Sequence, residues 1–249
     1  MISRTLLERL SNARLTVAFT GAGVSAESGI ATFRTNDGLW QQFRPEELAN
    51  VDAFLRNPDL VWQWYQARRQ VVLEARPNAG HRAIAELEGL LPNMSVITQN
   101  IDGLHTQAGS GEVIELHGNI RRNYCQNCHR RYDDEALLTV AEVQTCECGG
   151  RIRPDVVWFG EMLPADAMLL AEQRTRAASV FFSIGTSAVV YPAAGLPLLA
   201  REMGAYTVEI NPEETPITPY MHESIRGTSG EVMPMIVAEL LKARNRVRV

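Results

Sequence analysis

The sequence predicts an α/β fold with a doubly wound, mostly parallel sheet and one small inserted module. Two observations lead to this fold class. Short apolar runs typical of buried strands alternate with amphipathic helical segments, and four cysteines gather in one stretch that lacks periodicity. The chain has 249 residues, of which 45% are hydrophobic and 21% charged, as in ordinary globular proteins. This length allows one large domain, or a large and a small one.

The first elements are a helix, a strand and a glycine turn. Apolar residues have helical spacing within residues 1–13, and residues 14–20 are typical of a short buried strand. Gly21-Ala-Gly23 follows at once. In open α/β sheets such a turn places a nucleotide on the N-terminal dipole of the next helix, so we expect a helix after it.

Residues 58–75 form the clearest predicted helix, with Asn57 as its N-cap and Pro58 in its first turn. Residues 79–90 predict another helix with one apolar face.

The alternation continues to the C-terminus and is interrupted once. Further strands are predicted at residues 95–98, 112–116, 179–184 and 205–210. Further helices are predicted at residues 165–178, 192–203 and 230–243. Between them, residues 121–153 carry the cysteines and many charges, which marks the inserted module. We therefore divide the chain into residues 1–120 with 154–249, which form the sheet domain, and residues 121–153.

Charge and hydropathy exclude some classes of protein. The net charge of −5 argues against bulk nucleic-acid binding, which needs an excess of Lys and Arg. Apolar runs are shorter than the roughly 18 to 20 residues that span a bilayer, so we expect no membrane helix. The N-terminal apolar stretch is too short for a secretory signal, and Glu8 interrupts its basic part, so we expect a cytoplasmic protein.

The glycine turn fits a dinucleotide fingerprint in part. Gly21-Ala-Gly23-Val-Ser-Ala26 matches G-x-G-x-x-G/A, in which missing side chains let the backbone approach a pyrophosphate. The acidic residue expected about 20 residues later is missing, because residues 30–34 are typical of a loop. An ordinary hydride-transferring dehydrogenase is therefore disfavoured. A glycine turn with a purely structural role remains an alternative.

Polar side chains follow two of the predicted strands. His117 lies just past residues 112–116, at the edge where open α/β sheets bind ligands, and a neutral imidazole there can act as a general base. Gln99, Asn100 and Asp102 follow residues 95–98 and suit ribose hydroxyls or a positioned water. The alternatives are a structural histidine and an ordinary polar turn.

The cysteines form two pairs, Cys125 with Cys128 and Cys146 with Cys148. In a reducing compartment such pairs are typical of metal ligands, and four thiolates give a closed tetrahedral site for structural Zn²⁺. One residue separates the second pair where two to four are usual, so that half of the site is irregular. His129 as a substitute ligand, and four unligated thiols, are the alternatives.

Several motifs in order resemble one known family. They are Gly21-Ala-Gly-Val-Ser-Ala-Glu-Ser-Gly-Ile-Ala-Thr-Phe-Arg34, Thr98-Gln-Asn-Ile-Asp102, Leu116-His-Gly118, the cysteine pairs, Val157-Trp-Phe-Gly-Glu161, Gly185-Thr-Ser187 and Ile210-Asn-Pro212. Together they resemble the sirtuins, the NAD-dependent protein deacylases, over residues 14–243. Ala31 departs from the family, where proline is common.

The resemblance implies a Rossmann-like NAD domain with a zinc-ribbon module, and it implies roles for individual residues. The residues implied to bind NAD are Gly21, Ala22, Gly23, Glu27, Phe33, Arg34, Gln99, Asn100, Ile101, Asp102, Gly185, Thr186, Ser187, Asn211, Glu213 and Ser229. The implied catalytic residues are His117, Asn100 and Asp102. The implied zinc ligands are Cys125, Cys128, Cys146 and Cys148. The implied substrate-binding residues are Ala49, Tyr65, Arg68, Val157, Phe159, Gly160 and Glu161.

The implied reaction consumes NAD. The carbonyl oxygen of an acyl-lysine attacks C1′ of the nicotinamide ribose as nicotinamide leaves, which gives an imidate. His117 then deprotonates a ribose hydroxyl, and lysine and O-acyl-ADP-ribose are released. The implied partner is an acyl-lysine protein or peptide that adds as a strand between Gly160-Glu161 and the segment after Ser187. We expect a monomer that binds no membrane.

The helix at residues 58–75 points to acidic acyl groups and forms part of the acyl pocket. Tyr65 and Arg68 are three residues apart and share one helix face, and they match the Tyr-x-x-Arg pair of the branch that removes succinyl and malonyl groups. A guanidinium and a phenol together can bind a carboxylate. The small Ala49 fits the same interpretation. The alternative is that Arg68 is a solvated helix arginine.

Three other functions remain open on the sequence alone. The first is a plain deacetylase, and the second is a mono-ADP-ribosyltransferase that passes ADP-ribose to a protein nucleophile. The third is a binding module that senses NAD and docks partners through the zinc ribbon.

Overall fold

The computed structural model describes residues 2–31, 48–132 and 135–247. Its centre is a six-stranded sheet in the order β3-β2-β1-β7-β8-β9, and every neighbouring pair is parallel. The strands are β1 (Thr16–Thr20), β2 (Met94–Thr98), β3 (Val113–Glu115), β7 (Val180–Ile184), β8 (Tyr206–Ile210) and β9 (Glu223–Ile225). The predicted doubly wound parallel sheet is confirmed.

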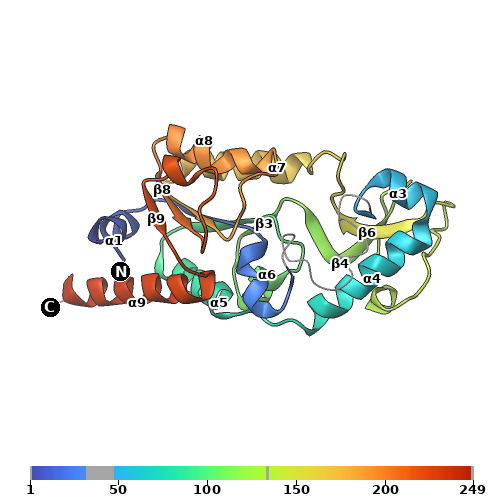
Figure 1. Ribbon diagram of the computed structural model, residues 1–249, viewed down its shortest axis with the longest axis horizontal. Coiled ribbons are helices and arrows are strands. Elements are labelled where there is room, and N and C mark those ends of the chain that lie inside the picture. Colours follow the sequence, from blue (N-terminus) through green and yellow to red (C-terminus); the bar gives the residue numbers. More distant parts are fainter. Residues whose placement is uncertain (1, 32–47, 133–134, 248–249) are drawn as a thin grey trace.

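Helices cover both faces of this sheet (Figure 1). On one face lie α1 (Arg4–Ser11), α5 (Ala79–Leu90) and α9 (Ser229–Val247). On the other lie α7 (Ala165–Ala177) and α8 (Leu196–Glu202). All five residues of β1, β2 and β7 are buried, as parallel strands between two helical layers require. Each layer forms its own apolar core with the sheet.

A second, smaller unit lies at one end of the elongated molecule (Figure 1). It contains the antiparallel sheet β5-β4-β6 together with the helices α3 and α4. These elements are β4 (Gly118–Cys125), β5 (Arg131–Tyr132), β6 (Ile152–Val156), α3 (Val51–Arg56) and α4 (Pro58–Glu74). On α4, the Trp62 indole donates to the carbonyl of Val140 at 2.8 Å. The guanidinium of Arg69, which is 1% exposed, donates to the carbonyl of Ile120 at 2.7 Å.

Most of the predicted elements are confirmed within a residue or two. The helix predicted at residues 58–75 ends one residue earlier, and Asn57 caps it by accepting from the backbone N–H of Leu60 at 3.2 Å. The helix at residues 79–90 matches α5. The helix predicted to begin at residue 192 starts as the short 3₁₀ turn η5 (Ala193–Gly195). The final helix runs four residues past its predicted end.

The helix expected directly after the glycine turn is wrong for the described residues up to Ala31. Two single 3₁₀ turns, η1 (Ala22–Val24) and η2 (Ala26–Ser28), stand in its place. Gly29 ends them with a φ of 81°, a left-handed conformation that stops helix growth. The turn therefore offers the backbone amides of short 3₁₀ turns and not the dipole of a long helix.

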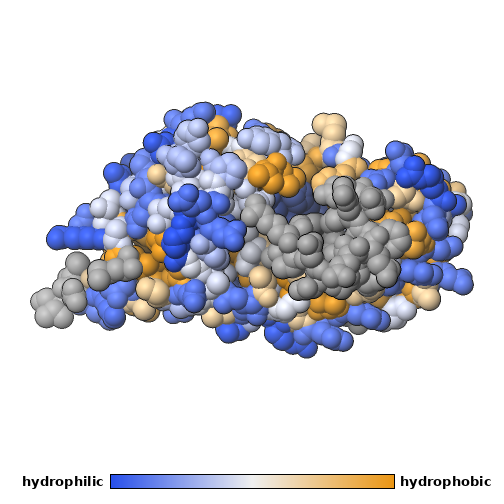
Figure 2. All heavy atoms as spheres, in the orientation of Figure 1, coloured by the Kyte–Doolittle hydropathy of each residue, from blue (hydrophilic) through white to orange (hydrophobic). Residues whose placement is uncertain are grey.

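Four features carry no clear signal in the sequence: α3, the five-residue helix α6 (Leu104–Ala108), the edge strand β9 and the sheet of the small unit. No helix among the described residues is long and apolar enough to cross a bilayer. The face of the molecule in Figure 2 is mostly hydrophilic, with apolar residues in small groups.

Candidate active site

The carboxyl ends of the parallel strands bring most of the predicted site residues to one edge. Gly21 follows β1, Gln99 follows β2, His117 lies two residues after β3, Gly185 follows β7 and Asn211 follows β8. Open α/β sheets bind their ligands at this edge.

The turns after β1 and β7 pack directly against each other. The backbone N–H of Gly23 donates to the carbonyl of Gly185 at 2.8 Å. A Cβ atom on Gly21 or Gly23 would lie 2.8 Å from the carbonyl oxygen of Gly185, which real Cβ atoms do not tolerate. Both glycines are thus needed for contact between the two turns, besides any approach of a pyrophosphate.

Hydrogen bonds join the turns that follow β2, β7 and β8. The hydroxyl of Thr186 accepts from the Gln99 amide at 2.9 Å, and its carbonyl accepts from the Asn211 amide at 2.9 Å. Ser187 follows in the same turn, and Glu213 lies exposed beyond Asn211.

A buried polar network lies under the glycine turn. The Asn100 amide donates to the carbonyl of Gly21 at 3.0 Å and to the hydroxyl of Ser25 at 3.1 Å. Ser25 donates to Asp102 Oδ2 at 2.7 Å, and Asp102 Oδ1 accepts from the N–H of Leu104 at 2.8 Å. The structure therefore holds two of the predicted catalytic residues, Asn100 and Asp102, in one network.

Two histidines complete this network. His81 Nε2 lies 3.5 Å from the hydroxyl of Ser25, and the His81 ring packs on that of His105 with centroids 4.8 Å apart. His105 Nε2 lies 2.9 Å from the hydroxyl of Thr20. Burial lowers the pKa of His81 to about 4 and that of His105 to about 3, so both rings are neutral at pH 7. Ser25 and both histidines were missed as site residues; the signal for Ser25 was its place inside the glycine motif.

His117 has the geometry of a general base. Its Nδ1–H donates to the carbonyl of Gln99 at 2.9 Å, which leaves Nε2 unprotonated and able to accept a proton. Burial lowers the pKa of His117 below its ordinary value, and the bond to Gln99 opposes this shift in part. The carbonyl of His117 accepts from the N–H of Val157 at 3.0 Å, which ties it to the predicted substrate segment.

Four further residues of the predicted NAD site lie around these turns. Ala22 belongs to η1, and the carbonyl of Ile101 accepts from the N–H of Ile120 at 2.8 Å. The carboxylate of Glu27 accepts from the N–H of Gly230 at 2.9 Å, in the first turn of α9. Ser229 is buried, and its hydroxyl has no hydrogen-bond partner among the described residues. Phe33 and Arg34 lie outside the described residues.

The polar groups at this edge fit NAD. Amide and hydroxyl donors suit pyrophosphate oxygens, and a carboxylate can accept from ribose hydroxyls. The hydroxyl of Ser229 is a buried polar atom that a ligand can satisfy.

The residues predicted to bind the acyl chain lie on α4, in the segment just before α3 and in the loop after β6. Tyr65 is buried, and its hydroxyl oxygen accepts from the indole N–H of Trp158 at 2.9 Å. Arg68 lies on the same helix face with its Cζ 5.0 Å from the centre of the Trp64 ring. Burial raises the pKa of Tyr65 to about 12 and lowers that of Arg68 to about 10, so the phenol is protonated and the guanidinium charged at neutral pH.

The remaining predicted substrate residues surround this pair. The N–H of Phe159 donates to the carbonyl of Ala49 at 2.8 Å, which joins the loop after β6 to the start of α3. Gly160 adopts a φ of 88° and makes the turn. The carboxylate of Glu161 points back into the protein and pairs with Arg153 at 2.6 Å.

The four cysteines form one cluster, with sulfur atoms all within 4.8 Å of one another. Cys125 and Cys148 lie 3.5 Å apart and Cys128 and Cys146 lie 3.6 Å apart, sulfur to sulfur. A tetrahedron with Zn–S bonds of about 2.3 Å has sulfur separations of about 3.8 Å, so the cluster fits Zn²⁺. His129 is not among the clustered ligands. With four thiolates the site is closed and structural.

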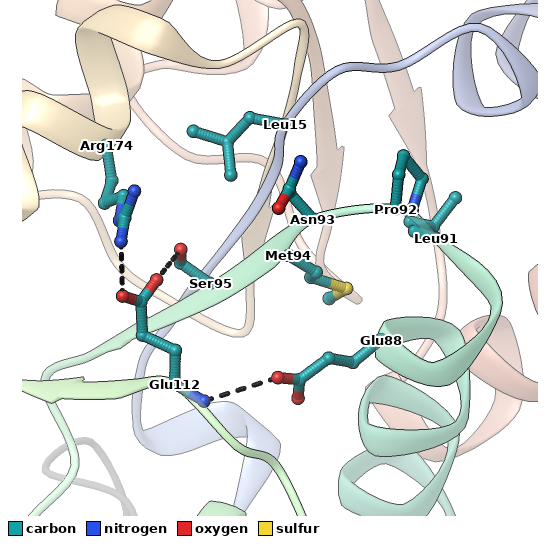
Figure 3. A pocket seen from close by; sticks show the side chains of 9 residues that line it. All are labelled: Leu15, Glu88, Leu91, Pro92, Asn93, Met94, Ser95, Glu112 and Arg174. Atoms are coloured by element: carbon teal, nitrogen blue, oxygen red, sulfur yellow. Dashed lines mark hydrogen bonds and ion pairs between the residues drawn. The ribbon is translucent and has the colours of Figure 1, made fainter.

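A depression of about 400 Å³ lies at the opposite end of the sheet, beside the amino ends of β1 and β2. Glu112 is the centre of its hydrogen bonds (Figure 3). Glu112 accepts from Ser95 and from Arg174, the latter at 2.5 Å, and Glu88 accepts from the N–H of Glu112. A parallel α/β sheet binds ligands at its other end, so this depression is not the candidate site.

Comparison with known proteins matches this arrangement to one family. Residues 21–192, more than half of the chain, match the Sir2 family model. The chain belongs to the Sir2 family. A relative from Aquifex aeolicus, named NAD-dependent protein deacylase, is 53% identical over 86% of this chain and 91% of its own length. NAD-dependent protein deacylase 1 of Archaeoglobus fulgidus is 49% identical over 96% of this chain and 98% of its own.

Solved structures of Sir2 proteins agree over nearly the whole chain. A Sir2 homologue in complex with NAD is 48% identical and superposes with a TM-score of 0.92 over 98% of this chain and 95% of its own. A Sir2 protein with a deacetylated p53 peptide and 3′-O-acetyl ADP ribose is 36% identical, with a TM-score of 0.85 over 96% of this chain and 98% of that one. The sirtuin resemblance of the sequence is confirmed.

Proposed function

We propose that this protein is an NAD-dependent protein deacylase that removes succinyl and malonyl groups, and also acetyl groups, from lysine side chains. The observation that carries the acidic preference is the pairing of Tyr65 with Arg68. The two side chains share one face of α4, and the Tyr65 hydroxyl is held by Trp158. Membership of the Sir2 family and the deacylase relatives support the general activity.

Tyr65 and Arg68, here called the acyl pair, have the chemistry to bind a carboxylate. The phenol of Tyr65 keeps its proton at neutral pH and can donate it, and the guanidinium of Arg68 keeps its charge. A charged hydrogen bond is worth about 1.5 to 3 kcal/mol, which corresponds to a preference of about 10- to 150-fold for succinyl over a neutral acyl chain. The side chain of Ala49 leaves room for the longer chain.

The residues of the sheet edge act on the ribose. Bound NAD supplies the ADP-ribosyl group and the bond to nicotinamide that is broken. His117 Nε2 accepts a proton from a ribose hydroxyl, because its Nδ1 proton is held by the carbonyl of Gln99. Asn100 and Asp102, fixed by Ser25 and the backbone, orient the ribose and its surroundings. The peptide adds as a strand beside Gly160 and Glu161.

We also propose that the protein acts in the cytoplasm as a monomer. The tetrathiolate cluster supports a reducing compartment, where thiols persist as metal ligands.

The test compares acetyl-lysine and succinyl-lysine peptides of one sequence, with NAD, on wild type, Arg68→Met and Arg56→Met. We expect the succinyl peptide to have the higher kcat/KM in wild type, and Arg68→Met to lower that value about 10- to 150-fold. Arg56 is an exposed arginine at the end of α3, so Arg56→Met should retain the preference. Equal rates on both peptides in wild type would identify a plain deacetylase. Labelling of protein by ADP-ribose would identify a transferase.

A further inference from the structure

A chain of buried contacts leads from the acyl pair into the loop after β6. The indole N–H of Trp158 donates to the Tyr65 hydroxyl oxygen at 2.9 Å, and the two residues are 1% and 3% exposed. Because the phenol oxygen accepts this bond, its own proton points away from the indole. The indole therefore sets the direction in which Tyr65 can donate.

Trp158 is itself held on both sides. The guanidinium of Arg153 lies over the indole, with Cζ 3.3 Å from the ring centre. The ring of Phe54 packs against it with centroids 5.0 Å apart. A ring enclosed in this way at the density of a protein interior keeps one rotamer.

Arg153 is buried, and a partly buried ion pair with Glu161 fixes it. Its two terminal nitrogens bind the two carboxylate oxygens of Glu161 at 2.6 and 2.9 Å, a bidentate geometry that sets the plane of the guanidinium. Glu161 also accepts from the backbone N–H of Trp158 at 2.8 Å, and Arg153 donates to the carbonyl of Val156 at 2.9 Å. Glu161, implied by the resemblance to bind substrate, here holds the loop that carries Trp158.

We propose that Trp158 is a positioning residue for acyl specificity: its indole N–H orients the Tyr65 hydroxyl toward the carboxylate of the acyl chain, and the Arg153–Glu161 pair holds the indole in place. This inference rests on the proposed acidic-acyl function. It assigns a part of the selectivity to a residue that acts through the Tyr65 hydroxyl.

The first test is a double-mutant cycle read as the ratio of kcat/KM for succinyl and acetyl peptides. Trp158→Phe keeps a ring but removes the N–H, so we expect the ratio to fall about 2- to 12-fold, mainly through KM of the succinyl peptide. In a Tyr65→Phe background the same change should leave the ratio where Tyr65→Phe alone has set it. Tyr206→Phe is the control, because it also removes one hydrogen-bonding group from a ring, but on β8 of the parallel sheet, where the hydroxyl donates to Glu223 at 3.2 Å, and it should retain the ratio.

The outcomes separate this role from the proposed function. A wild type without succinyl preference overturns both. A wild type that prefers succinyl, with a Trp158→Phe variant that keeps the full ratio, overturns the positioning role alone.

A second measurement does not depend on the folding of the variant. The indole ¹H–¹⁵N resonance of Trp158, assigned in wild-type protein, should shift more with succinyl peptide than with acetyl peptide, because only the former engages the Tyr65 hydroxyl. Equal shifts with the two peptides would contradict the proposal.

Discussion

At the scale of single residues, His117, the proposed general base, should set the pH dependence of the reaction. The base must be neutral, and burial lowers its pKa below the ordinary 6.5. We therefore expect kcat/KM to rise with pH along an acid limb whose midpoint lies below 6.5 and to be level at neutral pH. His117→Ala should lower kcat about 10²- to 10⁴-fold, the usual value of a general base. A pH–rate profile with a midpoint above 6.5 would contradict this assignment.

The histidines buried behind the site make stability depend on pH. The pKa values of His81, about 4, and His105, about 3, lie below that of an unfolded histidine, so the unfolded chain takes up protons first. Stability is complete above pH 6.5 and falls by about 1.4 kcal/mol per pH unit and per histidine as pH drops below it. Urea unfolding at pH 7 and pH 5 measures this loss. His129→Gln, at an exposed position, should show the same loss, and equal free energies at the two pH values would refute the prediction.

The sequence predicts which residues lie at the site better than it predicts the hydrogen-bond partners of those residues. Gln99, Asn100 and His117 were found because polar residues directly follow apolar strands. The network that joins Ser25 to His81 spans 56 residues, and no local pattern encodes it. The predicted NAD contacts and substrate contacts of single side chains stay predictions.

At the scale of elements, Gly118 joins the two units of the molecule. It follows His117, begins β4 and pairs with Val156 at a φ of 77°. A Cβ there would collide with the carbonyl of Asp155. Gly118→Ala should therefore lower the free energy of unfolding by several kcal/mol and lower kcat by displacing His117. Gly204→Ala is the control, because Gly204 has a similar φ of 89° but open space around it and should cost only about 1 to 2 kcal/mol.

Local signals decided which elements could be predicted. The helices α4 and α5 carry N-cap asparagines, whose side chains accept from the first-turn amides in the structure. The strand β6 contains Arg153, Pro154 and Asp155, a sequence without strand character. Its position depends on pairing with β4 and on the packing of Arg153 against Trp158, which are long-range contacts.

At the scale of the whole molecule, hydrogen bonds join the module that carries the cysteines to α4, the helix of the proposed acyl site. Leu137 and Val140 lie between the two cysteine pairs in the sequence. Their carbonyls accept from the Gln66 amide at 3.0 and 2.6 Å. Val140 also accepts from Trp62. In the sequence of α4, Tyr65 lies between these two donors, Trp62 and Gln66. The sheet that carries the predicted NAD residues has its own cores, which contain no residue of this module.

Removal of zinc should therefore impair the acyl site before it unfolds the sheet. During slow chelation, with zinc release followed by a coloured chelator, we expect KM for the succinyl peptide to rise in step with release. Far-UV circular dichroism should retain most of its helical signal, because α1, α5, α7, α8 and α9 pack on the parallel sheet. Cys128→Ser, which removes one zinc ligand, should raise KM for the succinyl peptide in the same way without chelator. An unchanged KM after complete release would show that α4 keeps the acyl pair in place without the metal, and simultaneous loss of the whole helical signal would show that the two units unfold as one.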